Sequence, residues 1–231
     1  MLYLIGLGIR NNLSLEVINI LKKCKKVYLE NYTSVLQGSL DIKVEKVERE
    51  FVESYDVSKA KKENIAFLII GDVFAATTHI SLFNDCKEKN IDVKVFNNSS
   101  IITAVGITGL NPYNFGKVTS IPFDNKNVET SFKILENNKK INAHTLILLD
   151  LNPKEGKFLS IKEGIEYLEK RGFKGKMVGI ARLGSDDFVI KYGDCSKVKE
   201  EDFGKGPYCL VIPSDKLHFM EEEVLKKWEV Q

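Results

Sequence analysis

The sequence of 231 residues contains few cysteines and no cysteine pair at the spacing of a metal or redox site. The four cysteines, Cys24, Cys86, Cys195 and Cys209, are scattered, and no histidine follows them at zinc-ligand spacing. We therefore interpret them as reduced thiols of a cytoplasmic protein, and we expect neither a disulfide nor a bound metal. A chain of this length can bury a sufficient hydrophobic core without either.

The chain also lacks an excess of charge of one sign. Lysine and arginine number 34, and aspartate and glutamate number 32, so the formal net charge is +2. This balance gives no overall electrostatic reason to bind nucleic acid or an anionic membrane, and neither partner is expected. The apolar start, residues 1–9, has no basic segment before it and is too short to cross a membrane, so we interpret it as a strand.

Several catalytic signatures are absent as well. The sequence has no G-x-S-x-G nucleophile motif and no lysine-containing phosphate loop. Residues 6–9 begin with G-x-G, but no third glycine completes a dinucleotide fingerprint. The three histidines, His79, His144 and His218, lie far apart in the sequence, and we interpret His79 and His144 as structural. Residue patterns alone therefore assign no catalytic residue.

A buried-strand pattern stands at residues 64–79. Residues 65–70 are all apolar and Gly71 and Asp72 follow them, which predicts a strand buried on both faces of a parallel sheet. A buried helix is the alternative, but Gly71 and the polar residues after it favour the strand. Ligands of open α/β sheets bind beyond the carboxyl ends of the strands, where Asp72 would lie. A helix cap is the simpler role for a single carboxylate at such a position.

The rest of the chain alternates strand and helix patterns, which predicts an α/β fold. Strands are expected over residues 1–5, 26–30, 42–47, 91–96, 117–122, 144–150, 177–181, 187–191 and 208–212. Helices are expected after a cap at Asn12 or Ser14, and near residues 78–89, 101–110, 129–137, 161–170 and 217–228. In the last of these helices, Met220, Val224, Leu225 and Trp228 fall on one apolar face.

The segment 111–116 is rich in turn-forming residues and predicts a domain boundary. Pro112 disfavours helix at the residue before it, and Gly116 and two asparagines interrupt the rest of the segment. We therefore assign an N-terminal α/β domain to residues 1–112 and a C-terminal α/β domain to residues 113–231.

Seven segments, spread over nearly the whole chain, carry a family resemblance. They are LYLIGLGI (2–9), VYLENYTS (27–34), GDVFAATTH (71–79), SIITAVGITGLNPYNFGK (100–117), HTLILLDL (144–151), ARLGS (181–185) and EDFGKGPYCLVIP (201–213). With these segments the chain resembles the diphthine synthases, the methyltransferases of the diphthamide pathway within the tetrapyrrole-methylase superfamily. The patterns GD-x-x-x-ATTH and AVGITGL-x-x-Y-x-FGK are quite specific to this group.

The resemblance implies two α/β domains with S-adenosylmethionine in the cleft between them and S-adenosylhomocysteine as product. By motif position, the implied cofactor contacts are Ile9, Asp72, Ala75, Ser100, Ile101, Leu149, Leu183 and Tyr208. The family commonly has leucine in place of Ile9 and proline in place of Val73, and it often has histidine in place of Tyr208. At position 208 we therefore expect only the backbone to keep the contact.

The implied substrate is a histidine of translation elongation factor 2 that carries an aminocarboxypropyl group. Its amino nitrogen is methylated three times by archaeal-type enzymes, and eukaryotic relatives add a fourth methyl group as an ester. Pairing into a homodimer is implied by analogy with the superfamily. Two alternatives stay open: the same fold acting on a tetrapyrrole or on ribosomal RNA, and a non-catalytic nucleotide-binding module. The near-neutral charge disfavours the RNA alternative.

Overall fold

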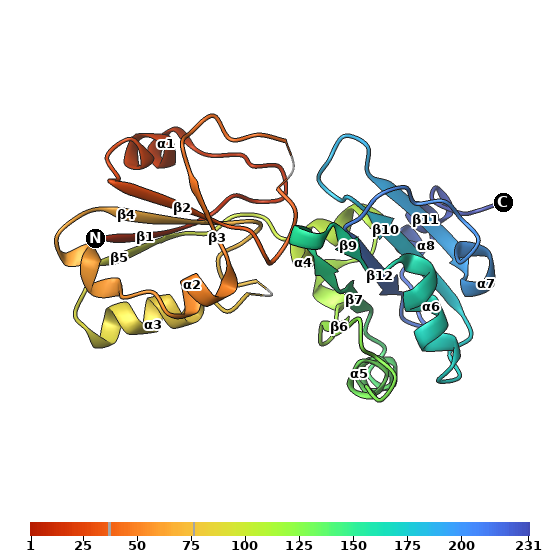
Figure 1. The fold of residues 1–231 in the computed structure, drawn as a ribbon. Coiled ribbons are helices and arrows are strands. Elements are labelled where there is room, and N and C mark those ends of the chain that lie inside the picture. The colour runs from red at the N-terminus through yellow and green to blue at the C-terminus, as the bar shows by residue number, and fades with distance from the viewer. Residues whose placement is uncertain (37, 76) are drawn as a thin grey trace. The chain divides into compact units, whose positions relative to one another are not determined.

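The structure is a computed structural model that describes residues 1–36, 38–75 and 77–231 (Figure 1). The chain forms two compact units, Met1–Ile101 and Ile102–Gln231, and each unit has its own five-stranded sheet. The α/β class expected from the sequence is confirmed. The boundary expected between residues 112 and 113 falls inside the second unit. The segment before it belongs there because the Asn111 amide donates to Glu221 Oε1 at 2.8 Å, in the last helix.

Unit 1 is built on a parallel sheet with helices on both faces. Its elements are β1 (Leu2–Gly6), α1 (Leu15–Leu21), β2 (Lys26–Glu30), β3 (Glu45–Val47), α2 (Arg49–Glu53), the 3₁₀ turn η1 (Val57–Lys61), β4 (Ile65–Ile69), α3 (Ile80–Glu88) and β5 (Val93–Phe96). The strand order is β3-β2-β4-β1-β5, and all four pairings are parallel. In Figure 1, α1 lies on one side of this sheet, and α2 and α3 lie on the other.

The central strand β4 explains the long apolar run of the sequence. All five of its residues are buried, because β2 and β1 flank it and helices cover both of its faces. Successive side chains of a strand point to opposite faces. Phe67 accordingly packs in the core under α2 and α3, whereas Leu68 packs in the core under α1. A strand exposed on neither face needs no polar residue, as the sequence predicted.

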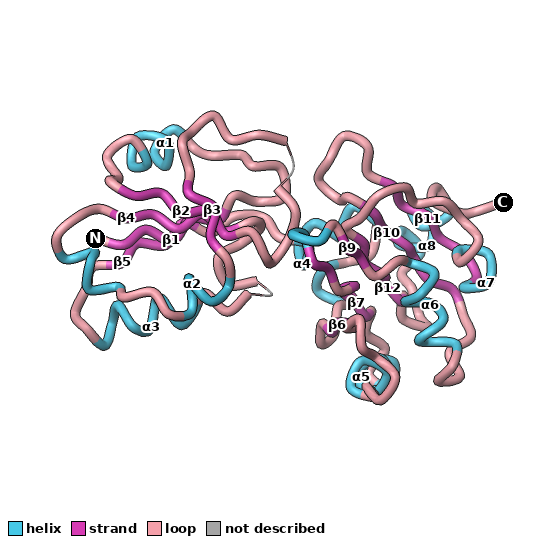
Figure 2. The backbone as a smooth tube through the Cα atoms, viewed as in Figure 1, coloured by secondary structure: helices cyan, strands magenta, loops and turns pink. Residues whose placement is uncertain are grey.

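Unit 2 has a mixed sheet. Its elements are α4 (Ile101–Ala104, whose first residue ends unit 1), η2 (Val105–Thr108), η3 (Pro112–Asn114), β6 (Thr119–Ile121), α5 (Thr130–Lys140), β7 (Thr145–Leu149), β8 (Leu151–Asn152), η4 (Pro153–Glu155), β9 (Lys157–Phe158), α6 (Ile161–Glu169), β10 (Lys176–Ala181), β11 (Val189–Asp194), α7 (Cys195–Val198), β12 (Tyr208–Ile212) and α8 (Phe219–Lys226). The strand order is β11-β10-β12-β7-β6, in which only β6 and β7 pair in parallel. Figure 2 separates these strands from the long loops that join them.

The helix α6 shows how local sequence fixes an element of unit 2. Ser160 caps it, and the Ser160 hydroxyl and Glu163 carboxylate form a reciprocal capping box. Its inner face buries Ile165 and Leu168 in the main core of the unit. Gly164 lets the helix approach the sheet closely, because a Cβ there would lie 2.9 Å from the Leu149 side chain. The end of β7 is therefore held against α6.

Three element predictions need correction. The strand expected over residues 42–47 is limited to β3, and the helix expected over 101–110 is the short α4 followed by the 3₁₀ turn η2, which ends at Gly109 with φ +93°. In α8, Met220 is 48% exposed, whereas Glu221 and Leu225 are buried, so the predicted apolar face is wrong for Met220. The Glu221 side chain points inward because its Oε1 lies within hydrogen-bond distance of the buried His144 Nε2 and accepts the Asn111 amide.

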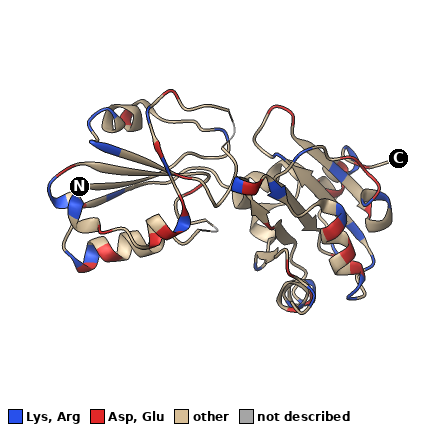
Figure 3. Ribbon diagram, in the orientation of Figure 1, with Lys and Arg blue, Asp and Glu red and all other residues tan. Residues whose placement is uncertain are grey.

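The surface chemistry agrees with the balanced composition. Figure 3 shows lysine and arginine interspersed with aspartate and glutamate along the helices of both units, as on α3 and α6. All four cysteines lie in the described part of the chain and are free thiols. None of the helices that the structure describes is long and apolar enough to cross a membrane.

Candidate functional site

The ends of β1 and β4 in unit 1 are clasped together by glycine backbone. Gly8 N donates to Gly71 O at 2.9 Å, and Gly71 N donates to Gly8 O at 3.2 Å. Both residues have positive φ, +68° and +88°, which glycine adopts at little cost. A Cβ on Gly8 would lie 2.6 Å from Asn98 Oδ1. The loop after β5 therefore lies too close to residue 8 for any residue other than glycine. The loops after three neighbouring strands therefore meet at one edge of the sheet.

Asp72 ties two of these loops together. Its Oδ1 accepts the Phe74 amide at 2.9 Å, and its Oδ2 accepts the Asn97 side-chain amide and the Asn98 backbone amide, both at 3.0 Å. Burial opposes ionisation, but these hydrogen bonds, with one from the Ala75 backbone, outweigh it and lower the pKa of Asp72. The carboxylate is charged at neutral pH and acts first as an organiser of the loop.

Five of the predicted cofactor contacts are thus brought to one place. Asp72 and Ala75 follow β4, and Asp72 is bonded to the segment that leads to Ser100 and Ile101 after β5. The Ile9 amide, after β1, donates to Ser99 Oγ at 3.2 Å. These residues lie beyond the carboxyl ends of β4, β1 and β5, which is the position expected for a ligand of a parallel sheet.

The three predicted contacts in unit 2 also share one sheet edge. Leu149 ends β7, Leu183 follows β10, and Tyr208 opens β12, which runs antiparallel to both. Tyr208 pairs with Ala181 at the end of β10. The Leu149 side chain is buried in the core and the Tyr208 hydroxyl donates to Gly204 O.

Arg182, in the segment 181–185 that carried the family resemblance, fixes the loop of unit 2 that holds Leu183. Its backbone is left-handed, with φ +51°. Its guanidinium donates from Nε to Asp187 Oδ2 at 2.8 Å and from Nη1 to the Phe203 carbonyl at 2.7 Å. Its backbone amide donates to Pro207 O at 2.9 Å, next to Tyr208. One side chain thus joins the loop after β10 to the entry of β12.

A second polar cluster in unit 1 was missed by reasoning from sequence. Glu30, at the end of β2, is completely buried, and it accepts backbone amides of Ile70 at 3.0 Å and Thr33 at 3.0 Å. Burial raises the pKa of Glu30, although the hydrogen bonds from Thr33, Ile70 and Tyr32 oppose this. His79 is also completely buried, and its Nε2 lies 3.3 Å from Tyr32 Oη. A charged residue that ends an apolar strand was the one available signal.

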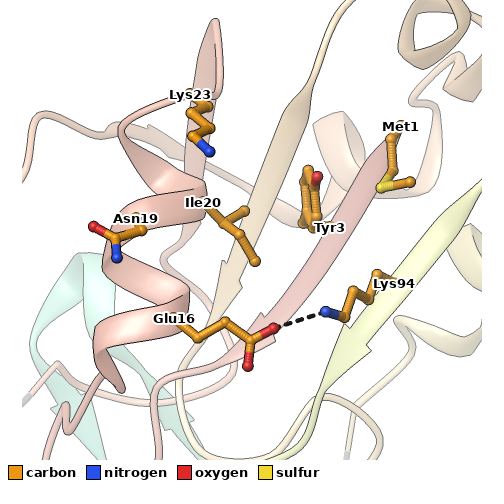
Figure 4. Close-up of a pocket in the computed structure, with 7 residues that line it drawn as sticks. All are labelled: Met1, Tyr3, Glu16, Asn19, Ile20, Lys23 and Lys94. Carbon is orange, nitrogen blue, oxygen red and sulfur yellow. Dashed lines mark hydrogen bonds and ion pairs between the residues drawn. The ribbon is translucent and has the colours of Figure 1, made fainter.

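A groove lies elsewhere on unit 1, between α1 and the strands β1 and β5 (Figure 4). It has a volume of about 430 Å³ and is lined by Met1, Tyr3, Glu16, Asn19, Ile20, Lys23 and Lys94. An ion pair of 2.8 Å between Lys94 Nζ and Glu16 Oε1 crosses it. None of the predicted contact residues lines this groove. Among the described residues, no group of three or more histidine, cysteine or acidic side chains could hold a metal ion.

Comparison with known proteins gives one consistent result. The family model for tetrapyrrole (corrin/porphyrin) methylases matches residues 1–198. A diphthine synthase from Methanocaldococcus jannaschii is 40% identical and one from Methanococcus maripaludis strain C5 is 38% identical, each over 98% of both chains. A crystal structure of diphthine synthase superposes with a TM-score of 0.90 at 30% identity, and covers 99% of this chain and 96% of that one.

Proposed function

Because the chain belongs to the tetrapyrrole methylases and, within them, to the diphthine synthases, we propose that it methylates the modified histidine of translation elongation factor 2. The chain is a methyltransferase by family. The acceptor is the amino nitrogen of the aminocarboxypropyl group, and three transfers give diphthine. The observation that carries the proposal is 40% identity to a diphthine synthase over 98% of both chains.

The proposed methyl donor is S-adenosylmethionine, and S-adenosylhomocysteine is the product that leaves. The residues proposed to hold it are Ile9, Asp72, Ala75, Ser100 and Ile101 in unit 1, and Leu149, Leu183 and Tyr208 in unit 2. The space beside Gly71 supports the fit: among the described residues, the one atom within 4 Å of a Cβ placed there is Ser99 O, at 4.0 Å. Open, backbone-lined space beside a glycine of φ +88° suits a ligand that lies against the main chain.

The chemistry asks little of the protein beyond binding and orientation. Bound S-adenosylmethionine supplies a methyl group that its sulfonium charge already activates. A bond from the acceptor nitrogen to the methyl carbon forms as the sulfur–methyl bond breaks, and the amine loses a proton before each transfer. Holding two reactants in attack geometry can supply about 7–11 kcal/mol of the barrier. Rigid loops are suited to that task, and Asp72 holds its own loop rigid by accepting the amides of Phe74 and Asn98.

Self-association and a cytoplasmic location complete the proposal. Large apolar side chains stand exposed around α8 in unit 2: Tyr113 is 95% exposed and Phe219 is 68% exposed. Large apolar side chains exposed on a surface can belong to a protein interface. They support a homodimer, which light scattering of the purified protein would detect.

The proposed function is tested by transfer of labelled methyl groups from S-adenosylmethionine. The protein is incubated with elongation factor 2 that carries the aminocarboxypropyl-histidine, with the unmodified factor, with a tetrapyrrole precursor and with ribosomal RNA. We expect label only in the modified factor. Label in the RNA or the tetrapyrrole would replace the proposed acceptor. Absence of both transfer and cofactor binding would favour the non-catalytic module.

A further inference from the structure

The carboxyl edge of the unit 1 sheet has two halves, and the proposed cofactor contacts use only one of them. The strand order is β3-β2-β4-β1-β5, and those contacts follow β4, β1 and β5. The other half lies beyond β2 and β3. It carries Tyr32, two residues after β2, and Arg49, two residues after β3. The Asn31 amide donates to Val47 O at 3.0 Å, so these two strand ends are joined.

Glu30 fixes this second half relative to the first. One of its carboxylate oxygens accepts the Ile70 amide at 3.0 Å, directly before Gly71 and Asp72. The other accepts the Tyr32 amide at 3.3 Å. Because Glu30 is completely buried and bonded on both sides, the backbone of Tyr32 has a set position beside the loop that Asp72 organises.

His79 sets the direction of the Tyr32 hydroxyl. The two rings stack with centroids 6.0 Å apart and planes inclined by 26°, and His79 Nε2 lies 3.3 Å from Tyr32 Oη. His79 Nδ1 is buried and has no hydrogen-bond partner among the described residues. A buried N–H without an acceptor costs more than a bare lone pair, so the proton belongs on Nε2, which donates to Tyr32 Oη. Tyr32 Oη also has a hydrogen bond with Thr78 that favours the phenolate, as expected if Oη accepts it, so the hydroxyl keeps its own hydrogen to donate.

The charge states agree with this hydrogen bond. Burial lowers the pKa of His79 to about 4, so the imidazole is neutral at pH 7. Burial, with a smaller effect of the Glu30 charge, raises the pKa of Tyr32 to about 12, although a hydrogen bond with Thr78 and the charge of Arg49 oppose it. Tyr32 therefore keeps its hydroxyl hydrogen and can act as a donor.

Arg49 adds a positive charge at the same place. Its guanidinium carbon lies 5.3 Å from the centre of the Tyr32 ring. Arg49 is exposed, and within the described ranges it forms no ion pair. The negative groups that act on Tyr32 are Glu30, whose oxygens are occupied by amides, and Glu53 on α2. A phenol donor beside an unpaired guanidinium is the combination that binds a carboxylate.

We propose that Tyr32 and Arg49 form a carboxylate subsite for the substrate, with His79 as a positioning residue behind Tyr32. This inference rests on the proposed function, because the aminocarboxypropyl group carries both the amine that is methylated and a carboxylate. Binding of the substrate carboxylate at this subsite would orient the amine beside the proposed cofactor contacts on the same edge of the sheet. S-adenosylmethionine also carries a carboxylate, so the test separates the two sources.

The test combines two substitutions with two substrates. Arg49→Gln removes the charge and Tyr32→Phe removes only the hydroxyl, while Lys46→Gln and Tyr3→Phe make the same chemical changes on β3 and β1 at side chains outside the cluster. The substrates are the modified factor with its carboxylate free and the same factor with that group as a carboxamide. KM is measured for each pair, and the Kd of S-adenosylmethionine is measured by calorimetry.

With the free carboxylate, Arg49→Gln and Tyr32→Phe should each raise KM about tenfold, the scale of a lost hydrogen bond to a charged group. With the carboxamide, wild type should show a raised KM, and the two substitutions should add little further. The Kd of S-adenosylmethionine and the two control variants should stay close to wild type.

Two outcomes would overturn the subsite. Equal losses on both substrates would show that Arg49 and Tyr32 do not meet the carboxylate of the substrate. A raised Kd for S-adenosylmethionine, with KM for the factor unchanged, would assign the carboxylate to the cofactor instead. Failure of the proposed function has a different signature, since wild type would then transfer no methyl group to either substrate.

Discussion

Each unit of the molecule buries one histidine completely, and the two side chains differ in how their nitrogens are satisfied. In unit 2, His144 Nε2 lies 3.1 Å from Glu221 Oε1, and Nδ1 accepts the Ser214 amide at 2.9 Å. In unit 1, the His79 ring has one hydrogen bond among the described residues, between Nε2 and Tyr32 Oη, and Nδ1 has no hydrogen-bond partner there. Both nitrogens of the His144 ring have hydrogen-bond partners, whereas one nitrogen of the His79 ring has none among the described residues.

His144 belongs to a structural clasp centred on Glu221. Glu221 also accepts the Asn111 amide at 2.8 Å and the His218 amide at 2.9 Å, so it joins the start of β7, the segment before η3 and the cap of α8. Burial would raise the pKa of Glu221, but these hydrogen bonds lower it, so a charged carboxylate faces a neutral imidazole. Polar groups with all their hydrogen bonds formed secure the fold, whereas a nitrogen without a partner near the proposed ligand site is a feature to explain by function.

The largest expected effect is the loss of this clasp. Glu221→Ala leaves the buried His144 Nε2 and the backbone amides of Asn111 and His218 without this acceptor, and should lower the free energy of unfolding by about 3 kcal/mol or more. Urea unfolding followed by circular dichroism measures the loss. Glu222→Ala, at the exposed neighbouring position of α8, is the control and should cost far less. Equal losses in the two variants would remove the clasp from the comparison.

The next effect is a loss of stability in acid, to which both histidines contribute. Burial lowers the pKa of His79 to about 4, and it also lowers the pKa of His144 although Glu221 opposes this. The unfolded chain takes up these protons below its ordinary histidine pKa of about 6.5, whereas the folded chain resists them. This linkage therefore leaves the free energy of unfolding unchanged above pH 6.5 and lowers it as the pH falls from 6.5 toward 4.

At about 1.4 kcal/mol for each unit of pKa, the part of this acid-induced loss of stability that His79 causes is about 3 kcal/mol. His79→Phe removes that share, so its urea midpoint should fall less than that of wild type between about pH 7 and about pH 4.5. The same fall in both proteins would mean that His79 is not held neutral by the fold.

A third effect separates ligand binding from loop capping in unit 1. Asp72→Ala should leave the chain folded and weaken the binding of S-adenosylmethionine by about tenfold or more. The reason is that the loop beside the proposed cofactor contacts loses its hydrogen bonds. Asp56→Ala is the matched control, since Asp56 also accepts the amide two residues on, from Ser58 at 3.1 Å. Calorimetry measures both affinities. Unchanged affinity in Asp72→Ala would reject the proposed role.

The smallest effect is expected from replacing His79, the histidine with one nitrogen that lacks a hydrogen-bond partner among the described residues. At neutral pH, His79→Phe removes one hydrogen bond and one unpaired nitrogen together, so the free energy of unfolding should change by about 1 kcal/mol or less. Urea titration at pH 7 checks this. A loss as large as that of Glu221→Ala would make His79 a clasp like His144, and the contrast between the two units would fail.

Much of this fold could be predicted from local pattern. The expected strands at Lys26–Glu30 and Tyr208–Ile212 are found with those bounds, because an apolar run ended by turn residues is a local signal. The strand order could not be predicted, because pairing depends on contacts far apart in the sequence. The Met220 face of α8 was wrong for the same reason, since distant donors draw Glu221 inward.

The candidate site divides in a similar way. The gathering of Asp72 with Ile9 and Ser100 follows from the rule that loops after parallel strands meet at one edge. The contact between Tyr32 and His79 does not follow from any rule of sequence, because it joins two residues that lie 47 positions apart in the chain. The segments that hold both residues carried the family resemblance without suggesting a role.

The central claim is that this chain methylates the amino nitrogen of the modified histidine in elongation factor 2. The most direct measurement is the mass of the acceptor peptide after incubation with the protein and S-adenosylmethionine. We predict a gain of three methyl groups, all on the aminocarboxypropyl nitrogen. No gain, with S-adenosylmethionine still bound, would contradict the claim and direct the search to a tetrapyrrole or RNA acceptor.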